Sequence, residues 1–408
     1  MTLKSGGKMY NGRKLDAAIE RVMKMNPGPA GLVCAVSKDG ETVYTRYEGF
    51  ADEQTGRKMQ GDTIFDIWSL TKVFVCTAAM TLFEQGAFLL NDPLDYYFPE
   101  YRDMQVYERD NWTLLRTRPA KTRITIRDCF TMATGFPYAT NFGTDKEVHP
   151  TIGRMLDVKK ALREKLGRPY TLQEEIHAMA EVPLAFDPGT QWMYGYSHEL
   201  VAGLVELCSG MRLSEYLKKT FFEPMGMKST GYHYEDGWKE RQAAFYSYNQ
   251  DGKRIPFNMS ISGHEPDEVY EAGGGGILST AEDMLKFFTM LANDGIYQGE
   301  QYIGRKTIDL MRRNHITEVQ RQDFMTGAHN AVYMPGYGYG LGVRTMIDPA
   351  GGFCNGSKGE FGWTGGSGTW AAADPEERFA VVYMHQLWPN LEEVIHQRIR
   401  AAAYGGIL

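Results

Sequence analysis

Alternating runs of hydrophobic residues near both ends of the chain predict two β-hairpins. Residues 31–37 and 41–47 are apolar-rich runs on either side of a Lys-Asp-Gly turn, and residues 368–373 and 379–384 repeat this arrangement around a short polar turn. Paired short runs separated by turn residues are typical of antiparallel strands. The two ends of the chain therefore both supply strands.

Helical spacing of apolar residues accompanies each hairpin, at residues 15–25 before the first and at residues 391–403 after the second. Strands at both termini with helices between them favour one antiparallel sheet assembled from the two chain ends and flanked by helices. The predicted fold class is thus α/β, in the segregated α+β arrangement.

An almost wholly apolar stretch at residues 65–86, with the sequence FDIWSLTKVFVCTAAMTLFEQG, predicts a helix that begins at Ser69 and ends at Gly86. Apolar residues occur on every side of this helix, so we expect it to be buried all round. Ser69 and Lys72 nevertheless lie three residues apart on one face of its first turn. A hydroxyl and an amine at the start of a buried helix are candidates for chemistry.

The middle of the chain is predicted to be mostly helical, with short turns. Two polar, aromatic and irregular stretches, residues 138–167 and 320–339, fit neither helix nor strand and are interpreted as long lid or binding loops. The helix-compatible patterns cover residues 126–133, 172–180, 199–208, 213–222 and 280–292.

Composition and charge remove several classes of function. A net charge of −7 spread over 408 residues, with no basic run, does not favour nucleic acid as a partner. The opening residues lack an apolar segment, and the buried helix is too short and too polar to span a bilayer, so neither a signal peptide nor a membrane span is expected. Five scattered cysteines in mostly apolar runs favour reduced thiols and a cytoplasmic protein.

Metal and cofactor motifs are not expected either. The nine histidines form no zinc-ligand spacing, and the glycine-rich run at residues 273–276 fits neither a dinucleotide fingerprint nor a phosphate loop. We therefore predict a protein with no metal and no cofactor.

The Ser-x-x-Lys pattern has two local interpretations. Ser69 and Lys72 could be a capping serine and a lysine that reaches solvent, and the copy at residues 5–8 illustrates how readily chance supplies the pattern. Alternatively, free N–H groups at the helix start would stabilise an oxyanion, and burial would leave more of the amine neutral to act as a base. That combination would activate a nucleophile.

The wider sequence resembles the superfamily of serine β-lactamases and penicillin-binding proteins, most of all class C β-lactamases and family VIII carboxylesterases. The resemblance covers roughly residues 15–400 and includes the Ser-x-x-Lys helix. Further matching segments follow in order: ITIRDCFTMATG at residues 124–135, FEPMGMKST at residues 222–230 and AGGGGILSTAEDM at residues 272–284.

The family's second catalytic element is a tyrosine on a loop facing the nucleophile, usually Tyr-x-Asn after Pro-Gly. Residues 188–197 read PGTQWMYGYS, and their spacing from Pro188 favours Tyr194 as the proton relay. Tyr196 then takes the position of the usual asparagine and is assigned to the substrate pocket. Because that asparagine helps β-lactamases to hold a substrate amide, its absence weakens the β-lactamase interpretation.

The third element is usually Lys-Thr-Gly on a strand beside the site, and here residues 362–368 read GWTGGSG. By resemblance, the N–H groups of Gly366 and Ser69 would form the oxyanion hole, and Trp363, Thr364 and Gly365 would line the substrate pocket. Trp363 replaces the cationic lysine, so the site would lose a charge that binds a substrate carboxylate. This departure favours neutral esters over β-lactams.

The resemblance implies a β-lactamase-like fold in one unit over residues 12–408, after a polar tail at residues 1–11. Its α/β part would comprise residues 12–85 and 275–408, and residues 86–274 would form a mostly helical insertion on the other side of the cleft. The implied activity is that of a serine hydrolase, most of all a carboxylesterase on small-molecule esters. A β-lactamase, a D-amino-acid peptidase or amidase, an acyltransferase and a non-catalytic binding protein remain alternatives, and the oligomeric state stays open.

Overall fold

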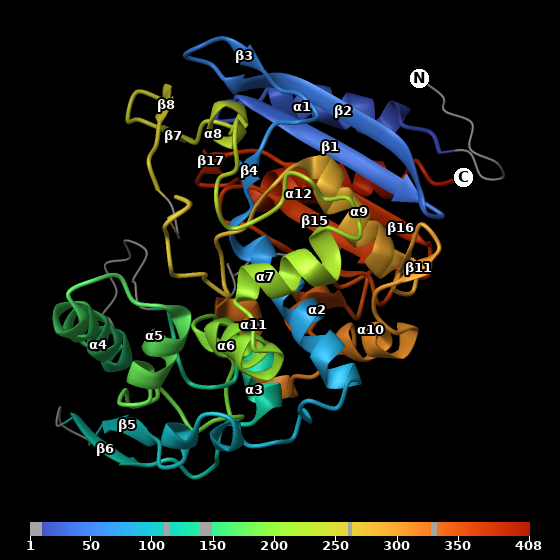
Figure 1. Ribbon diagram of the computed structural model, residues 1–408. Coiled ribbons are helices and arrows are strands. Elements are labelled where there is room, and N and C mark those ends of the chain that lie inside the picture. The colour runs from blue at the N-terminus through green and yellow to red at the C-terminus, as the bar shows by residue number, and fades with distance from the viewer. Residues whose placement is uncertain (1–9, 110–114, 139–148, 260–262, 328–332) are drawn as a thin grey trace.

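Figure 1 presents a computed structural model of the protein, which describes residues 10–109, 115–138, 149–259, 263–327 and 333–408. Its main feature is an eight-stranded antiparallel sheet that draws strands from both ends of the chain. The order across the sheet is β12 (Tyr337–Tyr339), β13 (Arg344–Met346), β14 (Phe361–Thr364), β15 (Trp370–Asp374), β16 (Phe379–Met384), β1 (Gly31–Lys38), β2 (Glu41–Asp52) and β3 (Arg57–Lys58).

The two predicted hairpins are neighbours in the centre of this sheet. Strand β1 pairs with β16 from Val33 opposite Met384 to Lys38 opposite Phe379. Every residue of β1, β15 and β16 is buried, because helices cover both faces. The predicted fold class, with a sheet built from both chain ends, is confirmed.

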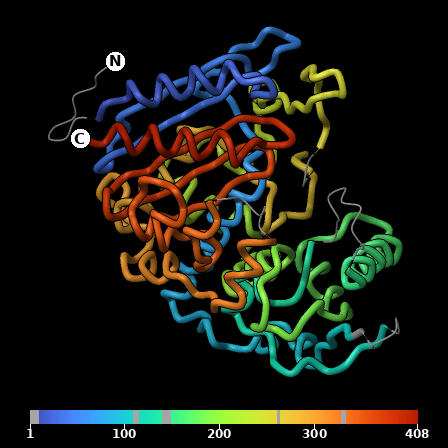
Figure 2. The backbone as a smooth tube through the Cα atoms, turned by 180° about the vertical axis from the view of Figure 1, so that it is seen from behind, coloured from blue at the N-terminus to red at the C-terminus, as the bar shows by residue number. Residues whose placement is uncertain are grey.

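Alternation along the central strands separates two apolar layers. Leu32, Cys34 and Val36 of β1 pack in one cluster with α1 (Arg13–Met23) and α12 (Glu392–Tyr404), whereas Val33 and Ala35 belong to the main core. Figure 2 shows α1 and α12 side by side on the outer face of the sheet. Helix α9 (Ala281–Ala292) contacts β1, β15 and β16 on the inner face.

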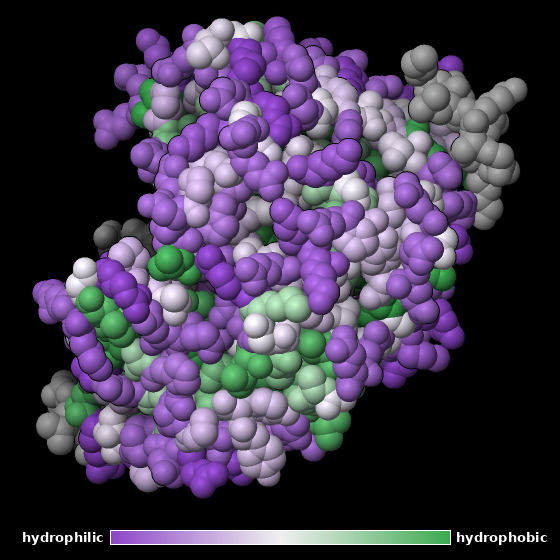
Figure 3. Space-filling view, in the orientation of Figure 1, coloured by the Kyte–Doolittle hydropathy of each residue, from purple (hydrophilic) through white to green (hydrophobic). Residues whose placement is uncertain are grey.

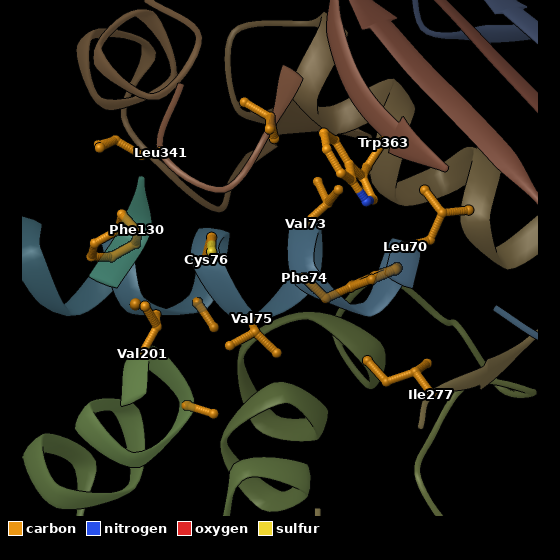
Figure 4. Packing of buried hydrophobic residues seen from close by; sticks show 14 of the residues in the cluster. Leu70, Val73, Phe74, Val75, Cys76, Phe130, Val201, Ile277, Leu341 and Trp363 are labelled. Carbon is orange, nitrogen blue, oxygen red and sulfur yellow. The ribbon is translucent and has the colours of Figure 1, made fainter. Parts of the chain in front are cut away.

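Helix α2 (Thr71–Glu84) lies at the centre of the main core, as predicted. All of its residues as far as Leu82 are buried. Figure 4 shows side chains that meet it from opposite sides, such as Val201 from the helical part and Trp363 from the sheet. The helix ends before Gly86, whose φ of 74° is the left-handed conformation common at helix ends.

Most of the other helices lie to the left of α2 in Figure 1, with α8 near the top and α10 on the right, and small sheets of two or three short strands occur in the connections. The helices are α3 (Ile126–Phe130), α4 (Pro150–Leu166), α5 (Leu172–Met179), α6 (Ser197–Ser209), α7 (Leu213–Leu217), which continues as a π-helical turn (Lys218–Phe222), α8 (Trp238–Arg241), α10 (Arg305–Met311) and α11 (Glu318–Gly327). The short strands are β4 (Phe65–Asp66), β5 (Gln105–Arg109), β6 (Leu115–Pro119), β7 (Tyr246–Tyr248), β8 (Arg254–Pro256), β9 (Leu278–Ser279), β10 (Ile296–Tyr297), β11 (Glu300–Gln301) and β17 (Leu387–Trp388).

The two predicted long loops are largely wrong. Residues 138–167 contain α4, and residues 320–339 contain most of α11 and all of β12. Helix α4 buries only Thr151, Met155 and Val158, so its apolar pattern is too sparse to indicate a helix. Residues 139–148 and 328–332 of these stretches lie outside the described residues, and the division of the chain into two parts stays a prediction.

The face seen in Figure 3 is mostly hydrophilic over the β1–β2 hairpin, whereas its hydrophobic side chains gather over the helical part. None of the helices that the structure describes has both the length and the apolar character needed to cross a membrane.

Phe74 tests how strongly α2 is anchored to α9. Its ring stacks on Phe287 with centroids 4.0 Å apart, and both rings are fully buried. We expect Phe74→Ala to lower the free energy of unfolding by about 3–5 kcal/mol, because a large cavity opens at a rigid contact. Phe353→Ala, at a position that is 75% exposed, should change it by less than about 0.5 kcal/mol. Urea unfolding measures both, and equal effects would contradict this packing.

Candidate active site

Ser69 lies where strand β4 gives way to α2 through a short 3₁₀ turn (Trp68–Leu70). The residue before it, Trp68, has a φ of 49°, a left-handed conformation that bulky residues rarely adopt. Its indole is held in place by stacking on Trp388 and by an edge contact with Phe245. This packing fixes the turn from which the Ser69 hydroxyl projects.

Lys72 is fully buried, yet its amine is not isolated. The Nζ atom donates to Ser69 Oγ at 3.1 Å, to the Tyr138 hydroxyl at 2.7 Å and to the Gly274 carbonyl at 2.6 Å. A lysine ammonium has three N–H donors, and here each donor has an acceptor. The capping interpretation with a solvent-directed lysine does not describe this side chain.

Tyr194 also forms a hydrogen bond with the serine. Its hydroxyl donates to Ser69 Oγ at 2.8 Å, and the Trp363 indole N–H donates to that same hydroxyl at 3.2 Å. The Lys72 amine also lies 4.9 Å from the centre of the Tyr194 ring. The structure therefore brings Ser69, Lys72, Tyr194 and Trp363 together.

The glycine turn after β14 packs against the segment before Ser69. A Cβ on Gly366 would lie 2.8 Å from the Trp68 ring, and one on Gly365 would lie 2.4 Å from the Ile67 carbonyl oxygen. The Thr369 hydroxyl donates to that same carbonyl at 3.0 Å. Only glycine allows this close approach, which places the Gly365–Gly366 backbone beside the start of α2.

A second pair of hydrogen bonds strengthens this junction. The Ser367 hydroxyl and the Gln386 side-chain amide both donate to the Asp66 carbonyl, at 3.2 and 2.9 Å. Two segments far apart in the sequence are thus tied together at both Asp66 and Ile67. These hydrogen bonds lie at the place where an oxyanion hole is predicted.

Two of the predicted pocket residues direct their side chains elsewhere. The Thr364 hydroxyl donates to Glu392 at 2.9 Å, in a buried network that includes Arg344. Tyr196 is 2% exposed and packs against Phe136, and its hydroxyl has no hydrogen-bond partner among the described residues. Neither side chain makes a hydrogen bond with Ser69, Lys72 or Tyr194 in the described part of the chain.

Sequence reasoning missed three members of this cluster: Tyr138, the Gly274 carbonyl and Glu199. Tyr138 stands three residues after the end of the family-like segment at residues 124–135, in a stretch that the sequence analysis interprets as a long loop. Glu199 reaches the site indirectly, because its carboxylate accepts the N–H groups of Gly273 and Gly274. The Gly274 carbonyl is a backbone group and leaves no signature in a pattern of side chains, so of the three only Tyr138 and Glu199 could be sought in the sequence.

Burial shifts the two ionisable side chains at the start of α6. Burial, and to a smaller extent the charge of Glu175, raises the pKa of Glu199 to about 7. Burial, reinforced by the charge of Lys72, lowers the pKa of His198 to about 3, so its imidazole is neutral at physiological pH. Glu199 is therefore a buried group near the site whose charge changes around neutrality.

A profile of the family described as Beta-lactamase matches residues 15–405 of the sequence. The chain belongs to this family. The resemblance predicted from the sequence is confirmed, and the fold is β-lactamase-like. Within the described residues, no three His, Cys, Asp or Glu side chains gather in a way that could hold a metal ion.

Relatives within and around the family cover most of the chain. Protein Rv1367c of Mycobacterium tuberculosis is 28% identical over 89% of this chain and 87% of its own length. Esterase EstB of Burkholderia gladioli is 25% identical over 83% of this chain and 80% of its own length. The solved structure of EstCE1, titled a hydrolase with promiscuous acyltransferase activity, superposes with a TM-score of 0.77 at 20% identity, over 97% of this chain and 98% of that chain. Family and relatives support a hydrolase-type enzyme.

The junction at Gly365 yields a stability prediction. We expect Gly365→Ala to cost about 1–3 kcal/mol of unfolding free energy, because its Cβ would lie 2.1 Å from Thr369 Oγ1 in a tightly packed turn. Gly153→Ala is the matched control: nothing lies within 4 Å of that Cβ, and it stands inside α4, so it should stabilise by up to about 1 kcal/mol. Opposite signs in thermal unfolding support the junction, and two stabilising changes would refute it.

Proposed function

We propose that the protein is a serine carboxylesterase that cleaves small neutral esters through an acyl-enzyme. One observation carries this proposal: Ser69 Oγ lies within hydrogen-bond distance of both the Lys72 amine, at 3.1 Å, and the Tyr194 hydroxyl, at 2.8 Å. A hydroxyl with two adjacent groups able to move its proton is an activated nucleophile.

The partners of Lys72 support its role as the base. A carbonyl oxygen can only accept, so the Gly274 carbonyl engages one N–H of the amine whether or not the amine is charged. In the neutral amine, the lone pair can then face Ser69, which donates its proton as Oγ attacks the ester carbonyl. Tyr194 passes its proton to the departing alkoxide oxygen, so that an alcohol leaves, and the proton taken up by Lys72 then replaces the one that Tyr194 gave away.

The second half of the reaction reverses these transfers. Water adds to the acyl-enzyme carbonyl, gives one proton to the Lys72–Tyr194 pair, and the C–Oγ bond breaks as Ser69 regains its proton. In each half, the developing oxyanion would be held by the N–H groups of Ser69 and Gly366. The ties from Thr369 to Ile67 and from Ser367 to Asp66 support this role, because they hold the two donor segments at a fixed separation.

The surroundings of Trp363 support a neutral ester as substrate. Where many family members carry a lysine, this chain has an indole that packs on the Tyr194 ring with centroids 5.6 Å apart. The nearby Arg344 guanidinium lies 6.0 Å from the Trp363 ring but is paired with the buried carboxylate of Glu392 at 2.9 Å. Its charge is already balanced, so a substrate carboxylate gains little there.

Substitution of Ser69 tests the proposed nucleophile. We expect Ser69→Ala to lower the turnover of p-nitrophenyl acetate by at least about 10³-fold and to abolish covalent labelling by a fluorophosphonate, because the attacking oxygen is gone. Ser357→Ala, in the connection between β13 and β14, should retain both activities. Wild-type protein that is neither active nor labelled would favour a binding protein, and rapid nitrocefin hydrolysis would favour a β-lactamase.

Tyr194 is tested by removal of a single oxygen. We expect Tyr194→Phe to lower kcat for p-nitrophenyl acetate about 10²- to 10⁴-fold with a small change in KM, since proton transfer to the leaving group is impaired while the ring remains. Tyr302→Phe, just before α10, should behave like the wild type. A Tyr194→Phe variant with wild-type kcat would exclude the relay.

A further inference from the structure

The carboxylate of Glu199 forms hydrogen bonds with the glycine turn that contacts the Lys72 amine. One of its oxygens accepts the N–H of Gly273, and the other accepts the N–H of Gly274 at 3.0 Å. The carbonyl of the same Gly274 accepts the Lys72 amine at 2.6 Å. Glu199, on α6, is therefore linked to Ser69 through two glycines and one lysine, although it touches neither Ser69 nor the substrate position.

The glycine turn packs closely against these partners, with no room for a side chain. A Cβ on Gly273 would lie 2.2 Å from the His198 carbonyl oxygen, closer than any side chain tolerates. A Cβ on Gly274 would meet the Tyr138 hydroxyl at 2.9 Å and the Lys72 amine at 3.2 Å. The turn therefore lies in close contact with both α6 and the Lys72 amine. Its orientation depends on the hydrogen bonds that the Glu199 carboxylate accepts from Gly273 and Gly274.

We propose that Glu199 is a positioning residue that orients the Lys72 amine towards Ser69, and that its ionisation switches this orientation on. This inference rests on the proposed acyl-enzyme function. An ionised carboxylate accepts both glycine N–H groups at once, one on each oxygen. A protonated carboxyl turns one oxygen into a donor and a much weaker acceptor, so one N–H loses its charge-assisted bond and the hold on the turn is loosened.

The groups around Glu199 place this switch near neutral pH. Burial and the charge of Glu175 raise the pKa of Glu199 to about 7, while the two glycine N–H groups and Lys159 act in the opposite direction. Glu175 itself is paired with Lys159 at 3.1 Å and accepts the Tyr270 hydroxyl at 3.0 Å. The remaining facing groups are Lys72 through Gly274, the neutral His198, and four tyrosines whose raised pKa keeps them uncharged: Tyr138, Tyr196, Tyr232 and Tyr270.

Protonation of Glu199 should lower turnover. As the pH falls through about 7, Glu199 gains a proton, one glycine N–H bond is weakened, and the amine is held less firmly towards Ser69. Turnover should therefore fall on the acid side and reach a plateau on the alkaline side of this value. The effect belongs to kcat, because Glu199 contacts the turn and not the substrate.

The decisive variant is Glu199→Gln, whose amide presents one acceptor and one donor to the two glycine N–H groups and so mimics the protonated state. With p-nitrophenyl acetate between about pH 5.5 and pH 8.5, we expect kcat to fall about 10- to 100-fold at the plateau, with KM changed less than about twofold. The acid-side fall of the wild type should disappear. Glu199→Asp keeps the charge and should retain that fall with an intermediate kcat.

Glu206→Gln is the matched control, because it removes a largely buried carboxylate two turns further along α6 that accepts from Leu213 N–H and Gln173, remote from Lys72. It should keep the wild-type kcat and pH profile. Circular dichroism checks that each variant folds. If Glu199→Gln does not fold, the Glu199→Asp variant and the wild-type profile decide, and a wild-type kcat that is flat across pH 7 overturns the proposal.

Different results would overturn the proposed function and the positioning role of Glu199. A wild-type protein that neither turns over the ester nor takes a fluorophosphonate on Ser69 would overturn the proposed function. A wild type that does both, beside a Glu199→Gln variant with unchanged kcat and pH profile, would overturn the positioning role alone.

Discussion

The burial of the Lys72 amine is the constraint on which the rest of the site depends. An amine with no access to water must find all of its hydrogen-bond partners in the protein, or lose several kcal/mol. Lys72 satisfies this requirement with a serine one turn before it, a tyrosine from the segment after α3 and a backbone carbonyl from the segment before β9. Meeting the needs of one side chain therefore fixes the relative positions of three separate segments.

The sheet fixes the position of a fourth segment, the glycine turn between β14 and β15. Because β14 and β15 follow each other in the sheet, the turn between them lies at its end, and its glycines allow contact with the backbone before Ser69. The hydrogen bonds at Asp66 and Ile67 are made to carbonyl groups, so they hold the chain direction as well as the distance. A sheet built from both chain ends is thus the means by which the nucleophile and a late glycine turn become neighbours.

The sequence analysis predicted best those helices and strands that bury most of their apolar residues. Strands β1, β15 and β16 and most of α2 are buried on all sides, so their apolar runs gave a clear signal. Ser69, Lys72, Tyr194 and Trp363 stand in segments with family-like spacing. The sequence analysis missed helix α4 because its three buried residues give almost no periodic pattern of apolar positions. The pocket assignment of Tyr196 rests on its place two residues after Tyr194 and stays a prediction, and its ring packs against Phe136.

The least predictable part of the site is the support beneath the amine, and its chemistry explains why. A carboxylate is an expensive group to bury, and the second carboxylate of Glu175 nearby makes its ionisation harder still. An amide would avoid the charge, but it would offer one acceptor oxygen and turn an NH₂ donor towards the second N–H group. The Gly273–Gly274 turn presents two such groups side by side, so it selects for a carboxylate at Glu199 in spite of the cost. The requirement arises from backbone donors that exist only once the chain has folded, and it is therefore absent from any pattern of side chains.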